Sequence, residues 1–142
     1  MKALKKLTPN LMVRDVRRSV AFYVDVLGFE PVAFVSGENG MESGLVPGRR
    51  YVWALVRSGA VEVMLQAEES LRTDVEVLSK CPIGSSATLY CETDDVGELY
   101  GRVRAGAEIV KELSTAWYGA DEFYVRDPDG YVLAFAQARA GK

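Results

Sequence analysis

The chain has 142 residues, of which 49% are apolar and 26% are charged, a composition typical of one globular domain with a packed core. Its 17 basic and 20 acidic residues give a net charge of -3, and the basic residues form no stripe, which disfavours nucleic-acid binding. No stretch reaches the roughly 20 apolar residues of a membrane span, and Arg14 and Asp15 interrupt the N-terminal apolar run, so we expect a cytoplasmic protein without a signal peptide.

The sequence contains no histidine. Because histidine is the commonest transition-metal ligand, its absence excludes two-His-one-carboxylate iron sites and His-ligated zinc, and it also excludes Ser-His-Asp and Cys-His catalysis. Cys81 and Cys91 lack a metal-type spacing, and we interpret them as a loop thiol and a core thiol. Any catalysis would depend on Glu, Asp, Tyr, Lys, Cys or a borrowed cofactor.

The first half of the chain predicts a strand, a helix and three further strands. Apolar residues recur at helical spacing from Val16 to Leu27, with Asp15 able to cap the start and Gly28 placed to end the helix. The polar, Gly-rich stretch 36–50 predicts a loop. The predicted strands are 7–13, 29–35, 51–56 and 61–66.

The second half predicts the same order of elements. A helix begins at Asp94 and Asp95, runs through Val103 and ends at Gly106. The sequence Asp-Pro-Asp-Gly at 127–130 predicts a tight turn. The predicted strands are 87–92, 108–113, 123–126 and 131–137, and a short helix at 71–78 is possible in the connection between the halves.

Each half therefore reads βαβββ, and the halves can be aligned by residue. Residues 8–16 align with 88–96, and residues 61–67 align with 131–137. Such a repeat requires that two periodic patterns agree, so it is stronger evidence for the fold than any single motif. We predict an α+β fold in which residues 1–142 form a single domain, with module one at about 5–67, a linker at about 68–85 and module two at about 86–138.

Two segments carry a family resemblance. The sequences NLMVRDVRRSVAFYVDVLGFEPV and FYVRDPDGYVLAFAQ resemble the glyoxalase, bleomycin-resistance and extradiol-dioxygenase superfamily, also called the vicinal oxygen chelate fold, and the resemblance covers essentially the whole chain. It implies two pseudo-symmetric modules, each curling a mixed sheet around a shared cavity. It also implies a homodimer, because many members of the family pair in that way.

The resemblance places four metal-ligand positions at Thr8, Met64, Thr88 and Ala134, where the family's metal enzymes have mostly His, Gln and Glu. Threonine hydroxyls are weak ligands, a thioether prefers soft metals, and alanine has no donor atom. We therefore predict no metal and no cofactor, and we place the chain closest to the metal-free, bleomycin-resistance-like branch. This departure puts the family's metal-dependent activities in doubt.

Strand alternation assigns the side chains that face the cavity, because residues two apart share a face. Asn10 and Tyr90, with the carboxylates of Glu62 and Glu92, share that face with the metal-equivalent positions. The resemblance adds Tyr124, a position that family members often use at the ligand, and Trp117 and Tyr118 in the loop before that strand, where related binding proteins often carry a ligand-stacking tryptophan. Trp53 fits the core or an interface better than a ligand contact. Glu62 and Glu92 can be solvated or salt-bridged, and Arg126 can pair with Glu92 or reach solvent. The predicted ligand-binding residues are Thr8, Asn10, Trp53, Glu62, Met64, Thr88, Tyr90, Glu92, Trp117, Tyr118, Tyr124 and Ala134.

Three functions compete. The first is a metal-independent protein that sequesters an aromatic or amphipathic compound, possibly cationic, such as an antibiotic; for this function we assign no catalytic residue. The second is a lyase, isomerase or dioxygenase-type enzyme, with a carboxylate metal site at Glu62 and Glu92 or with acid–base chemistry from Tyr90, Tyr124 or Glu122. The third is an accessory dimerisation module whose cavity is filled. The expected partners are a small molecule and a second copy of the chain, with neither nucleic acid nor membrane.

Overall fold

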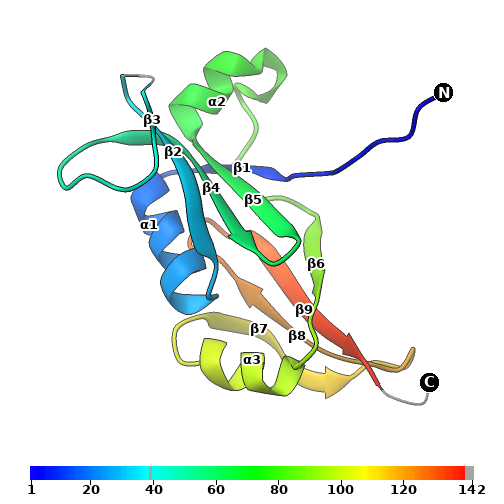
Figure 1. Ribbon diagram of the computed structural model, residues 1–142. Coiled ribbons are helices and arrows are strands. Elements are labelled where there is room, and N and C mark those ends of the chain that lie inside the picture. The colour runs from blue at the N-terminus through cyan, green and yellow to red at the C-terminus, as the bar shows by residue number, and fades with distance from the viewer. Residues whose placement is uncertain (39, 140–142) are drawn as a thin grey trace. The chain divides into compact units, whose positions relative to one another are not determined.

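The computed structural model describes residues 1–38 and 40–139 of an α+β protein with two mixed sheets (Figure 1). The chain divides into two compact units, the first unit Met1–Cys81 and the second unit Pro82–Lys142. Their boundary falls inside the stretch 68–85. None of the helices in the described ranges is long and apolar enough to cross a membrane.

The first unit carries a sheet in the order β1-β5-β4-β2-β3. β1 runs parallel to β5, and the other neighbouring pairs are antiparallel. α1 packs on one face of this sheet, against β4 and β5 (Figure 1). The elements are β1 (Asn10–Val13), α1 (Val16–Ala21), the π-helical turn η1 (Phe22–Val26), β2 (Glu30–Ser36), β3 (Met41–Glu42), β4 (Tyr51–Ser58), β5 (Val61–Ala67), α2 (Glu68–Asp74) and the 3-10 turn η2 (Glu76–Leu78).

The predicted first helix is confirmed in position, but its second half is wound differently. The Asp15 carboxylate accepts a hydrogen bond from the Arg18 backbone N–H at 3.2 Å and so caps α1 as expected. From Phe22 the helix widens to a π-turn, in which the backbone N–H of Leu27 donates to the carbonyl of Phe22 at 3.1 Å. The wider turn accompanies the edge-on packing of the buried Tyr23 ring against Phe22 and Phe29, each at 5.5 Å between centroids.

The second unit repeats the topology of the first. Its sheet has the order β6-β9-β8-β7, with β6 parallel to β9 and α3 against β8 and β9 (Figure 1). Asn10 lies opposite Met64 in the first sheet, and Tyr90 lies opposite Ala134 in the second, which are the equivalent pairs of the sequence alignment. The repeat is therefore confirmed in register. The elements are β6 (Thr88–Glu92), α3 (Val96–Val103), β7 (Glu108–Thr115), β8 (Ala120–Arg126) and β9 (Val132–Ala138).

Each sheet has an apolar face, as the alternation predicts. In the first unit Leu11, Val13 and Leu65 are buried, and in the second unit Phe123, Val125, Leu133 and Phe135 are buried. Burial of such side chains supplies the main favourable term in folding. Met12, Ala134 and Ala136 on the other face are buried too, so the predicted register is confirmed by the strand pairing rather than by burial.

The turn at 127–130 is structural, as predicted. The Asp127 carboxylate accepts hydrogen bonds from the backbone N–H groups of Asp129 and Tyr131, both at 2.9 Å. Gly130 has a φ of 93°, which a residue with a Cβ rarely adopts. This turn fixes the antiparallel register of β8 and β9.

Several predicted boundaries were wrong. β1 begins at Asn10 rather than residue 7, because Pro9 has no N–H to donate, although its carbonyl accepts from the backbone N–H of Met64 at 2.8 Å. The predicted loop 36–50 contains the two-residue strand β3, which is too short to give an apolar period. The predicted helix 71–78 is instead α2 followed by η2, and β8 begins three residues before its predicted start.

Candidate ligand-binding site

One face of the second sheet carries large polar side chains around two alanines. The strand register sets Tyr90, Ala134 and Tyr124 side by side across β6, β9 and β8. In the next row, Ala136 lies between Glu92 and Glu122. Ala134 and Ala136 are buried, so their small side chains form the floor between the larger ones.

The centre of this face is a buried carboxylate surrounded by phenols. Glu122 is 1% exposed. Its Oε2 accepts a hydrogen bond from the Tyr90 hydroxyl at 2.7 Å, and its Oε1 accepts one from Tyr118 at 2.5 Å and a long one from Tyr124 at 3.5 Å. We call Glu122 with Tyr90, Tyr118 and Tyr124 the tyrosine cluster. A buried charge is costly unless hydrogen-bonded, and these phenols supply the bonds.

The cluster holds Glu122 as a carboxylate and the tyrosines as phenols. Burial alone would raise the pKa of Glu122, but hydrogen bonds from Tyr118 and Tyr90, with the nearby charge of Lys111, outweigh it and hold the pKa below its ordinary value. The bond to Glu122 raises the pKa of Tyr90 and of Tyr118, and burial is the main cause that raises the pKa of Tyr124. Near neutral pH the cluster therefore carries one negative charge.

An exposed aromatic tier lies at the edge of the cluster. Tyr90 and Tyr118 are 49% and 51% exposed, and Trp117 is 95% exposed. The Trp117 ring meets Tyr118 edge-on at 5.4 Å, and the Lys111 ammonium lies 5.4 Å from the centre of the Tyr124 ring. Trp117 has almost no contact with the protein core, so core packing does not account for its position.

The turn between β7 and β8 presents Trp117 and Tyr118. The backbone N–H of Ala116 donates to the carbonyl of Ala120 at 2.8 Å, which closes the hairpin around the two aromatic residues. Gly119 has a φ of 93°, so a residue without a Cβ is needed there to reverse the chain. Tyr118 is thereby directed to Glu122 four residues later.

The structure brings together five of the predicted residues: Tyr90, Trp117, Tyr118, Tyr124 and Ala134. Thr88 and Glu92 lie on the same strand β6 and are exposed. The expectation that Arg126 could pair with Glu92 was wrong, because the register sets Glu108 opposite Arg126 and the two form an ion pair at 3.0 Å.

The central residue, Glu122, was missing from the predicted ligand-binding set. The alternation of β8 does place it on the same face as Tyr124. What the sequence could not show is the convergence of three hydroxyls on it. Tyr90 comes from β6, which is separated from β8 by β9, and Tyr118 comes from the turn before β8. The sequence signal that could have identified Glu122 is a glutamate on the same strand face as a tyrosine, with further tyrosines at nearby strand positions.

The predicted residues of the first unit take part in other contacts. The Asn10 amide donates to the Gln66 side-chain oxygen at 2.8 Å, and the Gln66 amide donates to Ser70 and Asp74, each at 2.8 Å. Glu62 accepts hydrogen bonds from Lys6 and, at 2.6 Å, from Arg57, and these bonds, led by Lys6, lower its pKa. The salt-bridged interpretation of Glu62 is therefore confirmed.

The remaining first-unit positions lie around this amide network. Trp53 is half-buried on β4, in register with Gln66, and Met64 is half-buried on β5. Thr8 precedes β1 and so is not a strand residue. Within residues 1–38 and 40–139, no three His, Cys, Asp or Glu side chains gather in a way that could hold a metal ion.

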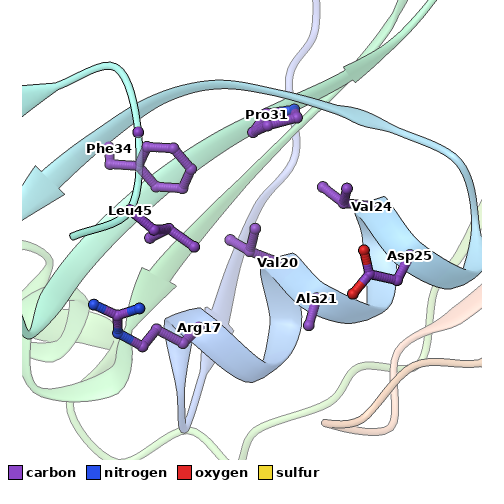
Figure 2. A pocket seen from close by; sticks show the side chains of 9 residues that line it. Arg17, Val20, Ala21, Val24, Asp25, Pro31, Phe34 and Leu45 are labelled. Carbon is purple, nitrogen blue, oxygen red and sulfur yellow. The ribbon is translucent and has the colours of Figure 1, made fainter. Parts of the chain in front are cut away.

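A separate apolar pocket lies between α1 and β2, with a volume of about 240 Å³ (Figure 2). Val20, Val24, Phe34 and Leu45 form its middle, and Arg17 and Asp25 lie at opposite ends. This volume is below the roughly 300–1,000 Å³ typical of ligand pockets. The lining residues are Arg17, Val20, Ala21, Val24, Asp25, Pro31, Phe34, Gly44 and Leu45.

Comparisons with known proteins agree with this fold. A bleomycin resistance protein of Geobacillus stearothermophilus is 26% identical over 133 residues, which cover 91% of this chain and 93% of that protein, and one of Staphylococcus aureus gives the same figures. TioX from Micromonospora sp. ML1 superposes with a TM-score of 0.69 at 23% identity, covering 95% of this chain and 99% of that chain. The family model of the Glyoxalase/Bleomycin resistance protein/Dioxygenase superfamily matches residues 6–135, and the chain belongs to that superfamily.

Proposed function

We propose that this protein binds and sequesters a small aromatic or amphipathic compound without a resident metal, and that the ligand carries a positive charge or several N–H donors. An antibiotic is one example of such a compound. The observation that carries the proposal is the tyrosine cluster, in which a buried, ionised Glu122 lies beneath exposed aromatic rings. Such a surface offers stacking area together with one fixed negative charge.

The hydrogen bonds of the tyrosine cluster favour a ligand that donates hydrogen bonds. A tyrosine hydroxyl has one proton, and Tyr90 and Tyr118 both donate theirs to Glu122. Their oxygens can then only accept a further hydrogen bond. Donation to a carboxylate also polarises a phenol and strengthens the bond that it accepts. The hydroxyls of these half-exposed tyrosines should therefore favour ammonium, guanidinium or amide N–H groups over carbonyls and carboxylates.

The pKa directions favour binding over acid–base catalysis. A general base works best when its pKa lies near the working pH, but the pKa of Glu122 is lowered from an already low value. A tyrosine acid or nucleophile would need a lowered pKa, but the pKa of Tyr118 is raised. With these pKa directions Glu122 is a weak base and Tyr118 a weak acid near neutral pH.

Calorimetric titration and tryptophan fluorescence quenching with bleomycin test the proposal. Bleomycin is a suitable first probe because relatives that match most of the chain bear its name. Trp117→Ala should weaken binding about two- to thirtyfold, since aromatic and cation–π contacts contribute about 0.5 to 2 kcal/mol. Met41→Ala, which removes an apolar side chain that is 70% exposed in the first unit, is the matched control. Equal affinities of the wild type and Trp117→Ala would reject the site, and a panel of planar cations without any binder would reject the function.

We further propose that residues 1–142 act as one domain, that the protein is a homodimer and that it is cytoplasmic. Family membership supports the first two of these proposals. Many proteins of this superfamily pair, and a C2 dimer is the commonest oligomer of soluble proteins. Sedimentation equilibrium at micromolar concentration should give twice the 15.6 kDa chain mass. A mass of one chain at all concentrations would contradict the dimer.

A further inference from the structure

A second pocket of about 250 Å³ lies where the start of α1 meets the start of β4 and the end of β5. We call it the arginine pocket because three of its lining side chains are guanidinium groups, from Arg14, Arg17 and Arg50. It lies within the first unit and shares no residue with the tyrosine cluster. The full lining is Arg14, Asp15, Val16, Arg17, Arg50, Tyr51 and Ala67.

Arg17 is held in a fixed orientation. Its Nε donates to the Arg49 carbonyl at 3.0 Å, and its Nη2 donates to the same carbonyl at 2.7 Å and to the Val46 carbonyl. The guanidinium carbon lies 5.1 Å from the centre of the Tyr51 ring. Within the described part of the chain, no acceptor meets Nη1 of Arg17, so two N–H donors stay available on a group that is already immobilised. A ligand bound there would cost little further side-chain entropy.

Arg50 can exchange its present partner for a stronger one. It forms an ion pair with Glu69 at 3.3 Å, and the two side chains are 64% and 82% exposed. An ion pair so open to water contributes little to stability. A bound anion that accepts hydrogen bonds from more than one arginine would therefore displace Glu69 at small cost.

The charge of the arginine pocket fits a doubly charged anion. Arg17 and Arg50 bring two guanidinium groups to the lining, in a chain whose net charge is -3. The one carboxylate of the lining, Asp15, already accepts the capping bond from the Arg18 backbone N–H. Planar guanidinium groups from separate elements match the several oxygens of a phosphate better than the two oxygens of a carboxylate.

We propose that the arginine pocket is a binding site for the phosphate dianion of a small phosphate monoester. Its lining shares no residue with the tyrosine cluster, so the two sites would recognise chemically different ligands. The apolar pocket adjoins it at Arg17, which lines both.

Titration with phenyl phosphate, followed by amide chemical shifts and by calorimetry at constant ionic strength, tests this proposal. We expect saturable binding, with the largest shifts at residues 14–17 and 50–51. Arg50→Gln should weaken binding about tenfold or more, because hydrogen bonds between charged groups are among the stronger ones. Arg57→Gln removes another exposed arginine, paired with Glu62 on β4 and β5, and should leave the affinity unchanged.

The dianion itself is tested by pH and by a carboxylate. Because the second pKa of a phosphate monoester is about 6, affinity should fall severalfold between about pH 7.5 and pH 5.5. Benzoate should bind at least tenfold more weakly than phenyl phosphate. No saturable binding at millimolar phenyl phosphate, an unchanged affinity in Arg50→Gln, or shifts centred on residues 90, 118 and 122 would overturn the proposal. The proposal that bleomycin binds at the tyrosine cluster does not depend on any of these outcomes.

Discussion

At the scale of single residues, Glu122 combines deep burial with a full negative charge. Replacing it by glutamine keeps its shape but removes the charge that the phenols of Tyr90 and Tyr118 stabilise. Glu122→Gln should lower the free energy of unfolding by about 1 to 3 kcal/mol, the usual cost of weakening hydrogen bonds to a buried charged group. Urea denaturation measures this loss.

Glu108→Gln is the matched control for that substitution. It removes a glutamate of the same sheet whose ion pair with Arg126 is exposed. Such a pair contributes little, so the unfolding curve of Glu108→Gln should stay close to that of the wild type. If both substitutions cost the same, the cluster contributes no special stability.

The same residues predict how stability depends on pH. The pKa of Glu122 is lowered by folding, so its contribution is present above about pH 4.3, the unfolded pKa of a glutamate, and is lost as pH falls through the folded pKa. The pKa values of Tyr90 and Tyr118 are raised by folding, so their contribution is present below about pH 10 and is lost as pH rises towards the folded pKa. Urea unfolding between pH 3 and pH 11 should show losses at both ends.

Variants separate the two limbs of that profile. Glu122→Gln should flatten the acid limb, because the titrating carboxylate is gone. Tyr118→Phe should flatten the alkaline limb, because one of the phenols whose pKa is raised is gone. An acid limb that stays unchanged in Glu122→Gln would assign the loss of stability to other carboxylates.

At the scale of elements, the small side chain of Ala134 lets β6 and β8 bring their tyrosines together. Ala134 on β9 is fully buried between Tyr90 and Tyr124. Ala134→Leu should cost about 1 to 3 kcal/mol through overpacking and should separate the two phenols. The change is measured by urea unfolding and by the affinity for bleomycin, which should fall with it.

Met64 supplies the control at the equivalent position of the first sheet. Met64 is half-buried on β5, and Met64→Leu conserves volume, so the expected cost is below about 1.5 kcal/mol. A smaller loss for Ala134→Leu than for Met64→Leu would show that the floor of the cluster is loosely packed.

Most elements followed from local patterns, and the exceptions depend on contacts that a local pattern does not record. The helix at Val16, the cap at Asp15 and the DPDG turn needed only neighbouring residues. The wider π-helical turn of η1 accompanies the packing of aromatic rings, and β3 forms by pairing with β2. Neither contact produces a period in the local sequence. The faces of the strands could be predicted because alternation is a property of each strand alone.

The site was harder to predict than the fold. Hydrogen bonds to Glu122 join residues 4 and 32 positions apart in sequence, and their geometry depends on the register between strands and on the hairpin turn at Gly119. The sequence placed Tyr90 and Tyr124 on one face but could not rank Glu122 above Glu62. The structure separates them, because Lys6 and Arg57 pair with Glu62, while among the described residues the Glu122 carboxylate accepts its hydrogen bonds from the hydroxyls of tyrosines.

At the scale of the whole molecule, we expect the protein to function without a transition metal. Mn²⁺, Ni²⁺ or Zn²⁺ should leave the melting temperature unchanged, since a metal that binds only the native state at a hundred times its Kd would add about 2.7 kcal/mol of stability. The affinity for bleomycin should be the same with and without a chelator. One equivalent of metal per chain after purification without affinity-tag nickel would contradict this expectation.

The matched registers of the two sheets have a further consequence for experiments. The two sheets have equivalent pairs of positions, Asn10 with Met64 in the first and Tyr90 with Ala134 in the second. The first pair carries an amide and a thioether, and the second carries a phenol and a methyl group. Each copy can thus serve as an internal reference for the other. A substitution introduced at both places stands at the same register position in two similar sheets, so the difference between its two effects reports mainly on the surrounding side chains.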